Sequence, residues 1–153
     1  MDATDDTIRE IFRHTRVIAC IGASPRPERP SHFVSLYLKA RGYRVIPVNP
    51  GQAGRELFGE KAVARVSDID LPVDMIDIFR RSDRVLPVVE EALDALPGLQ
   101  TVWMQIGVQS AKATELARAQ GVTVVENRCP MVEIPRLFGK HWTRSDGLTD
   151  QIG

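Results

Sequence analysis

The sequence predicts an α/β protein built on a parallel sheet of about five strands, with helices on both faces. Short apolar runs alternate along the chain with segments of helical periodicity, which is the order expected of βαβ units. Most of these runs are apolar at every position, as is typical of strands that are buried on both faces. The predicted strand order is 3-2-1-4-5, which is the Rossmann type.

Two helices and two strands are predicted in the first third of the chain. Apolar residues at helical spacing behind two aspartates predict a short amphipathic helix over 4–13. An apolar run predicts the first strand at 17–21, and the helix predicted over 31–42 has the length of a crossover between parallel strands. The second strand, at 44–48, runs into Asn49-Pro50-Gly51 and a loop punctuated by glycines.

Three more strands alternate with helices in the rest of the chain. Apolar runs predict these strands at 73–79, 101–106 and 122–125. Ser82 and Ser110 are suitable N-terminal caps for the two intervening helices, which Pro97-Gly98 and Gly121 are expected to stop. A last short helix is predicted in the tail, around Ile134.

Composition limits the possible partners and the location. The 153 residues fit one domain, 1–153, with a core over about 8–140. Twenty basic residues balance twenty acidic ones, which removes the bulk electrostatic basis for binding nucleic acid or an anionic membrane. The polar N-terminus and the lack of a long apolar run predict a cytoplasmic protein, and two cysteines are too few for a disulfide framework.

The carboxyl ends of the strands are the expected place for a ligand, because open α/β sheets bind ligands there. Gly22-Ala23-Ser24 follows the first strand, and Gly22 allows a tight turn that brings the backbone close to a ligand. The next helix offers unpaired N–H groups at its N-terminus. Arg26, Arg29 and Ser31 add the guanidinium and hydroxyl groups that bind phosphate oxygens, so this corner is a predicted phosphate site.

Two common nucleotide-binding fingerprints are incomplete. After Gly22, Ser24 and Pro27 stand where Gly-x-Gly-x-x-Gly needs glycines. The second strand ends in Asn49, whereas a nicotinamide site has an acid there for the ribose hydroxyls. No Gly-Lys-Ser/Thr follows the first strand, so a P-loop is excluded and NAD is disfavoured.

Six separated stretches give a more specific signal. They are Gly22-Ala23-Ser24, Arg29-Pro30-Ser31, residues 42–50, Val73-Asp74 with 79–82, residues 102–107, and Asn127-Arg128-Cys129-Pro130. In this order and spacing they resemble the small CoA-binding proteins, which are stand-alone relatives of the CoA-binding domain of the succinyl-CoA synthetase α subunit. The resemblance spans about residues 8–140.

This resemblance implies a Rossmann-like domain that holds CoA. The loop Gly22–Ser24 and the helix after it would face the diphosphate, and Asn49-Pro50 would lie near the nucleotide. The ends of the third and fourth strands, with Arg80, Arg81 and Gly107, would flank the pantetheine arm. CoA carries three phosphates, for which the available cations are Arg26, Arg29, Arg80 and Arg81.

Catalytic residues are harder to identify. None of His14, His32 and His141 has an acid or nucleophile partner at a motif spacing, and Ser24 has no visible base. Cys129 follows the last strand at the ligand edge, where its thiol could form a mixed disulfide with CoA, although an inert, half-buried cysteine is the favoured interpretation.

Three functional interpretations stay open. The first, which we favour, is a non-catalytic module that binds CoA or an acyl-CoA. The second is an enzyme, either an acyl-CoA-handling activity or an oxidoreductase that uses NAD(P). The third is an interaction protein in which the nucleotide corner is vestigial.

Overall fold

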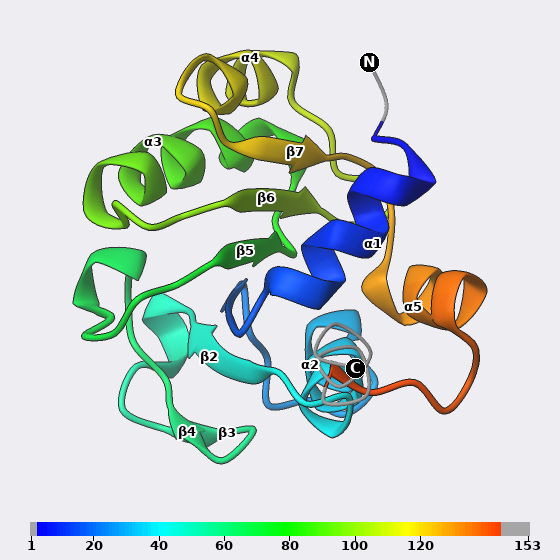
Figure 1. The fold of residues 1–153 in the computed structure, drawn as a ribbon. Helices are drawn as coiled ribbons and strands as arrows, with labels where there is room; N and C mark the ends of the chain where they lie inside the picture. Colours follow the sequence, from blue (N-terminus) through cyan, green and yellow to red (C-terminus); the bar gives the residue numbers. More distant parts are fainter. Residues whose placement is uncertain (1–2, 145–153) are drawn as a thin grey trace.

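A parallel sheet forms the centre of the computed structural model, which describes residues 3–144 (Figure 1). Its strands are β1 (Val17–Ile21), β2 (Arg44–Val48), β5 (Met75–Ile78), β6 (Thr101–Met104) and β7 (Thr123–Val125). The helices are α1 (Asp5–His14), α2 (Pro30–Ala40), α3 (Val85–Ala95), α4 (Ala111–Ala119) and α5 (Pro130–Phe138). The α/β class and the five-stranded parallel sheet are confirmed. The predicted domain ends at 1 and 153 lie outside the described residues.

The strand order differs from the predicted one. The sheet runs β2-β1-β5-β6-β7, which is 2-1-3-4-5 when its five strands are counted along the chain, so the prediction of 3-2-1-4-5 is wrong. The outer edge of β2 is occupied by the loop that follows it: Val63 bridges Val48, and the Asn49 N–H donates to the Val63 carbonyl at 2.9 Å. The third strand, β5, therefore pairs on the other side of β1, and the order reverses between β1 and β5.

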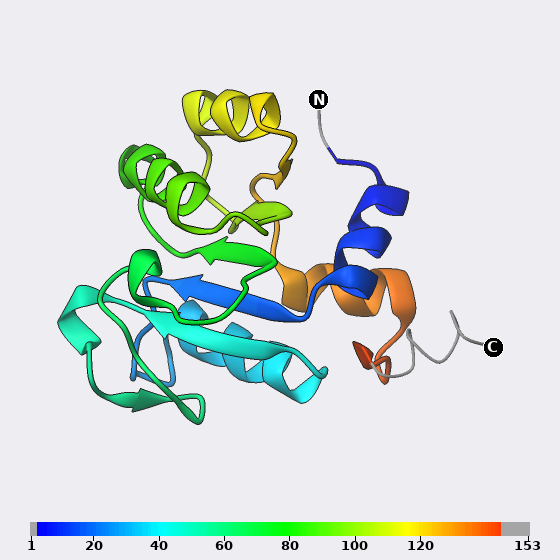
Figure 2. The ribbon, with the colours of Figure 1, turned by 60° about the vertical axis from the view of Figure 1, so that its left-hand side comes forward.

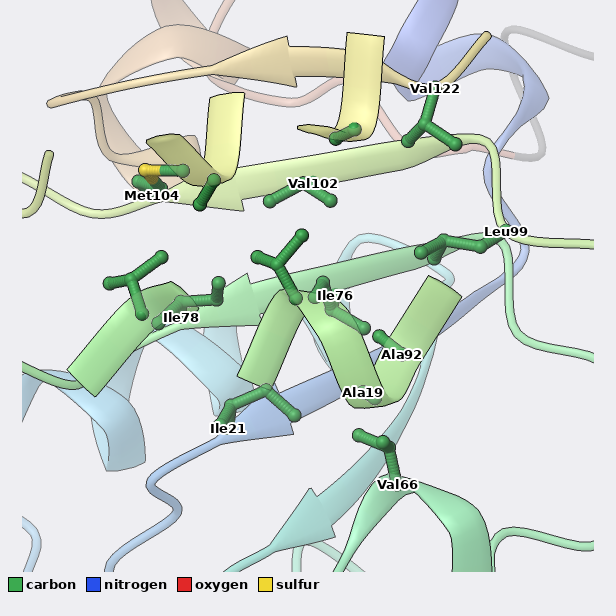
Figure 3. Packing of buried hydrophobic residues seen from close by; sticks show 14 of the residues in the cluster. Ala19, Ile21, Val66, Ile76, Ile78, Ala92, Leu99, Val102, Met104 and Val122 are labelled. Atoms are coloured by element: carbon green, nitrogen blue, oxygen red, sulfur yellow. The ribbon is translucent and has the colours of Figure 1, made fainter. Parts of the chain in front are cut away.

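The helices cover both faces of the sheet (Figures 1 and 2). Because successive strand residues point to opposite faces, each strand contributes to two cores. One face packs against α3 and α4 through residues such as Ile76 and Val102, and Figure 3 shows Ile76 beside Ala92 of α3. The other face packs against α1, α2 and α5 and contains Trp103. No helix within residues 3–144 combines the length and apolarity that crossing a membrane requires.

The loop after β2 and the start of α3 differ in detail from the expectations. Short turns of 3-10 helix lie at η1 (Pro50–Gln52), η2 (Val66–Asp68) and η3 (Ser82–Arg84), and a small hairpin joins β3 (Glu56–Leu57) to β4 (Glu60–Lys61). Ser110 caps α4 as predicted, by accepting the Ala113 N–H. Ser82 does not cap α3, which begins at Val85. Its hydroxyl instead accepts the Gln109 N–H at 3.0 Å, which ties the end of β5 to the loop after β6.

Candidate functional site

A cavity of about 980 Å³ opens where the order of the strands reverses. Its walls come from the loop after β1, the first turn of α2, the ends of β5 and β6, and the first turn of α5. Ile21 and Ile78 are register partners at the last paired position of β1 and β5, so Gly22 and Phe79 follow side by side. The cavity thus lies beyond the carboxyl ends of the central strands, where this topology places ligands.

Eight of the eleven predicted site residues line this cavity. They are Gly22, Ser24, Arg26, Arg29, Ser31, Arg80, Arg81 and Gly107. Of the other three, Ala23 is buried in the core on the α2 side of the sheet. Asn49 lies behind the loop, and Pro50 lines a neighbouring hollow.

Gly22 is required by the backbone beside it. Its φ of +91° is a conformation that side chains disfavour, and a Cβ there would lie 2.7 Å from the carbonyl oxygen of Phe79. The Gly22 N–H donates to the carbonyl of Val48 at 2.8 Å. The glycine therefore lets three neighbouring strand ends converge at the base of the cavity.

The N-terminus of α2 faces the cavity and has no side-chain cap. Arg29 occupies the cap position in extended backbone without a side-chain cap hydrogen bond, and Pro30 begins the helix. The preceding loop is held in place, because the His32 ring Nδ1 lies 2.9 Å from the Ser24 carbonyl oxygen and the Ser24 hydroxyl accepts the Arg26 N–H at 3.1 Å. An uncapped N-terminus beside Arg26 and Arg29 is suited to an anion.

Asn49 supports the loop rather than the cavity wall. Its side-chain amide donates to the Ala23 carbonyl at 2.8 Å, and its Oδ1 accepts the Gly51 N–H at 3.0 Å. A carboxylate at this position would lose the donor and place negative charge against a carbonyl oxygen. The residue thus has a structural reason to be an amide, whatever ligand is bound.

A second hollow, of about 810 Å³, adjoins the first. Phe79, Arg80 and Arg81 line both, so these three residues form a shared wall. The second hollow adds Arg65 and Arg84, which sequence reasoning missed. Arg84 could have been found as a third arginine in the turn after the third strand, whereas nothing local distinguishes Arg65, which lies far from that turn in the sequence.

The charge around these two hollows is unbalanced. Six of the lining residues are arginines, and within residues 3–144 no aspartate or glutamate lines either hollow. Two of the arginines have acidic neighbours: Arg81 pairs with Asp83 at 2.8 Å, and Arg65 lies 3.9 Å from Glu91. Glu91 is 34% exposed and the other three side chains are more exposed, so solvent weakens both pairs. The six lining arginines outnumber these two acidic neighbours, which leaves a positive potential in the hollows.

A buried carboxyl group lies on β5 next to the cavity wall. Asp77 is 1% exposed, and its Oδ1 accepts a hydrogen bond from the Gln105 side chain at 2.8 Å. Its Oδ2 has no hydrogen-bond partner within residues 3–144. Burial raises the pKa of Asp77 to about 7. Since Gln105 also lines the cavity, this carboxyl group is one side chain away from any ligand.

The histidines His14 and His32 have structural partners and do not face the cavity as catalytic groups. His14 is paired with Glu10 at 2.8 Å on the surface of α1. His32 is used to hold the loop after β1. Between residues 3 and 144, no group of three histidine, cysteine, aspartate or glutamate side chains is placed to hold a metal ion.

The two cysteines are both free but differ in access. Cys20 is 1% exposed under α2, and its thiol donates to the Ser31 carbonyl at 3.7 Å. Cys129 precedes α5 and lines the cavity. Burial raises the pKa of both thiols, so neither is a ready nucleophile near neutral pH.

Alkylation should therefore separate the two thiols. At pH 7 we expect iodoacetamide to modify Cys129 slowly and Cys20 not at all, with the Cys129 rate rising as the pH is raised toward its thiol pKa. Mass spectrometry of timed samples measures both rates, and urea-unfolded protein provides the unhindered reference. Equal rates for the two cysteines in the native protein would contradict this description.

Comparison with known proteins identifies the family. A family model described as a CoA binding domain matches residues 16–135. The chain belongs to this CoA-binding family. All the residues that line the first cavity lie within the match, and the resemblance predicted from the six sequence stretches is confirmed.

Relatives of this CoA-binding domain include small proteins of similar length. The uncharacterized protein YneT of Bacillus subtilis (strain 168) is 38% identical over 122 residues, covering 80% of this chain and 87% of that protein. The structure of cell-free ID.343 from Thermus thermophilus has a TM-score of 0.84 and 40% identity, and it covers 89% of this chain and 100% of that one.

A larger enzyme contains a similar domain. The dinucleotide forming acetyl-coenzyme A synthetase 1 of Ca. Korarchaeum cryptofilum, in complex with phosphate and ADP, has a TM-score of 0.62 and 27% identity. The match covers 79% of this chain but only 27% of the synthetase chain. The similarity therefore concerns one part of the enzyme, not its whole activity.

Proposed function

We propose that this chain binds CoA beyond the carboxyl ends of β1 and β5 and acts as a non-catalytic binding module. The observation that carries the proposal is the corner around Gly22, where a helix N-terminus without a side-chain cap opens onto two arginine-lined hollows. No carboxylate from the described part of the chain lines either hollow. Membership of the CoA-binding family supports the choice of ligand. A cytoplasmic location belongs to the same proposal, since both cysteines are free.

The shape of the site favours an elongated ligand with phosphates near its middle and at one end. The diphosphate would lie against the N-terminus of α2 and the shared wall of Arg80 and Arg81. The adenosine with its 3′-phosphate would extend into the hollow of Arg65 and Arg84, beside Pro50. The pantetheine arm would follow the larger cavity toward the end of β6. Inorganic phosphate would occupy only one of these phosphate positions and would leave the rest of the cavity unfilled.

Binding without turnover is supported by the hydrogen bonds of the candidate nucleophiles. The Ser24 hydroxyl accepts a backbone N–H, and the ring of His32 bonds the Ser24 carbonyl rather than the hydroxyl. The raised pKa of Cys129 leaves little thiolate at neutral pH. No activated nucleophile of the usual kind is thus formed by these three residues.

Calorimetry with CoA, dephospho-CoA and NAD tests the ligand. We expect CoA to bind with micromolar affinity or better, dephospho-CoA more weakly, and NAD weakest of the three. Arg84→Gln should weaken the binding of CoA by roughly 1.5–3 kcal/mol, the typical contribution of a hydrogen bond to a charged group. It should change the binding of dephospho-CoA much less. The matched control is Arg9→Gln, which removes the same charge from α1, where Arg9 pairs with Asp6.

Several results would overturn parts of this proposal. If the Arg84 variant lost equal affinity for CoA and for dephospho-CoA, the 3′-phosphate would not lie in that hollow. Wild-type NAD binding tighter than CoA would favour the oxidoreductase interpretation. Steady thiol release from acetyl-CoA, followed with a thiol reagent, would contradict the non-catalytic role.

A further inference from the structure

The walls of the larger cavity divide into a cationic half and an apolar half. Every charged side chain in its lining belongs to the loop after β1, the N-terminus of α2 or the end of β5. The lining from the end of β6 and the first turn of α5 carries no charge at all, and its apolar members are Ile106, Val108, Met131 and Val132.

Exposed apolar side chains gather around this cavity. Within residues 3–144, five large hydrophobic side chains are strongly exposed, and four of them line the cavity: Phe33, Ile106, Met131 and Val132. Ile106 is 64% exposed and Val132 is 54% exposed. Single exposed hydrophobic residues are normal on a protein surface, but a cluster around a cavity marks a surface that is covered when the protein works.

The polar groups near the apolar half are already engaged. The Asn127 side chain accepts the Gly107 N–H at 2.7 Å. Arg128, the nearest cation in the sequence to Cys129, donates to the buried Glu133 carboxylate at 2.6 Å. Among the described residues, this half of the lining offers a ligand carboxylate no cation, whereas an alkyl chain would cover Ile106 and Val132 without leaving a polar group unpaired.

We propose that the ligand of this site is an acyl-CoA with an apolar acyl chain, and that the chain packs on Ile106, Met131 and Val132. The inference rests on the proposed function, since phosphates bound at the arginines direct the pantetheine arm and its sulfur toward the end of β6. Free CoA would end there in a thiol and leave the apolar side chains in water. A thioester of an alkyl acid would continue across them.

Calorimetry with three ligands tests this assignment: CoA, hexanoyl-CoA and succinyl-CoA. Hexanoyl-CoA should bind about tenfold or more tighter than CoA, since burying a few methylene groups is enough for that factor. Succinyl-CoA should gain nothing over CoA. In the double variant Ile106→Gln/Val132→Gln, the dissociation constants of CoA and hexanoyl-CoA should become nearly equal. Both side chains are largely exposed, so circular dichroism should show an intact fold.

Leu36→Gln is the matched control. Leu36 is the fifth exposed hydrophobic residue, at 45%, and it lies on α2 outside the cavity lining, so its replacement should leave the ratio of these two dissociation constants unchanged. Equal affinities for CoA and hexanoyl-CoA would overturn the inference while CoA binding stands. A preference for succinyl-CoA, or a hexanoyl preference that survives the double variant, would also overturn it. Failure of all three ligands to bind would overturn the proposed function as well.

Discussion

Replacing Asp77 by asparagine is expected to raise the free energy of unfolding at pH 8 by roughly 2–4 kcal/mol and to change it little at pH 4. Burial raises the pKa of this carboxyl group from 3.8 to about 7 in the folded protein. Between these values the folded protein keeps a proton that the unfolded chain releases. The contribution of Asp77 to stability therefore falls as the pH rises from about 4 to about 7, by about 1.4 kcal/mol for each pKa unit.

Urea unfolding of the wild type and the Asp77→Asn variant between pH 4 and pH 8 measures this difference. The amide has nearly the shape of the protonated carboxyl group, so its Oδ1 can still accept from Gln105. Asp70→Asn, an exposed position before β5, makes the same chemical change at the surface and should show no such trend. A difference between Asp77→Asn and wild type that is constant with pH, or that shrinks as the pH rises, would rule out a buried titrating group at this position.

The helices and the strands of the main sheet were predictable from sequence because each depends on local patterns. Runs such as Val17–Ile21 are apolar throughout, and Ser110 is placed to cap the helix that follows it. The strand order was not predictable in this way. It depends on the pairing of Val63 with the edge of β2, an isolated contact made by a single residue just after the short strand β4.

The candidate site was predictable to a similar extent. Residues that follow strand ends, such as Arg80 and Gly107, do line the cavity, because parallel strands bring their carboxyl ends to one edge. Position along the chain does not say where a side chain points. Ala23 and Asn49 were therefore predicted to line the cavity, whereas Ala23 is buried in the core and Asn49 bonds its carbonyl. The contribution of Arg65 was missed because it depends on which loops lie beside β5 in space.

Substituting Gly22 with alanine is expected to lower the free energy of unfolding by roughly 2–4 kcal/mol and to weaken CoA binding at least tenfold. A non-glycine residue at φ +91° costs on the order of 1–2 kcal/mol. The new Cβ would also lie 2.7 Å from the Phe79 carbonyl oxygen, which is backbone and cannot rotate away, so β1 and β5 must separate at a further cost of about 1–2 kcal/mol. That movement widens the place where the diphosphate is proposed to bind, and valine should act more strongly.

The variant Gly121→Ala separates the cost of the positive φ from the cost of the close contact with Phe79. Gly121 has a φ of +79° and no atom within 4 Å of the added Cβ, and it lies before β7, at the end of the sheet away from the cavity. Its replacement should therefore cost only the backbone term and leave CoA binding unchanged. Far-ultraviolet circular dichroism should stay near wild type for both variants, because the strain is confined to a turn. If Gly22→Ala were no less stable than Gly121→Ala and bound CoA normally, the approach of Phe79 would not explain the glycine and the diphosphate would lie elsewhere.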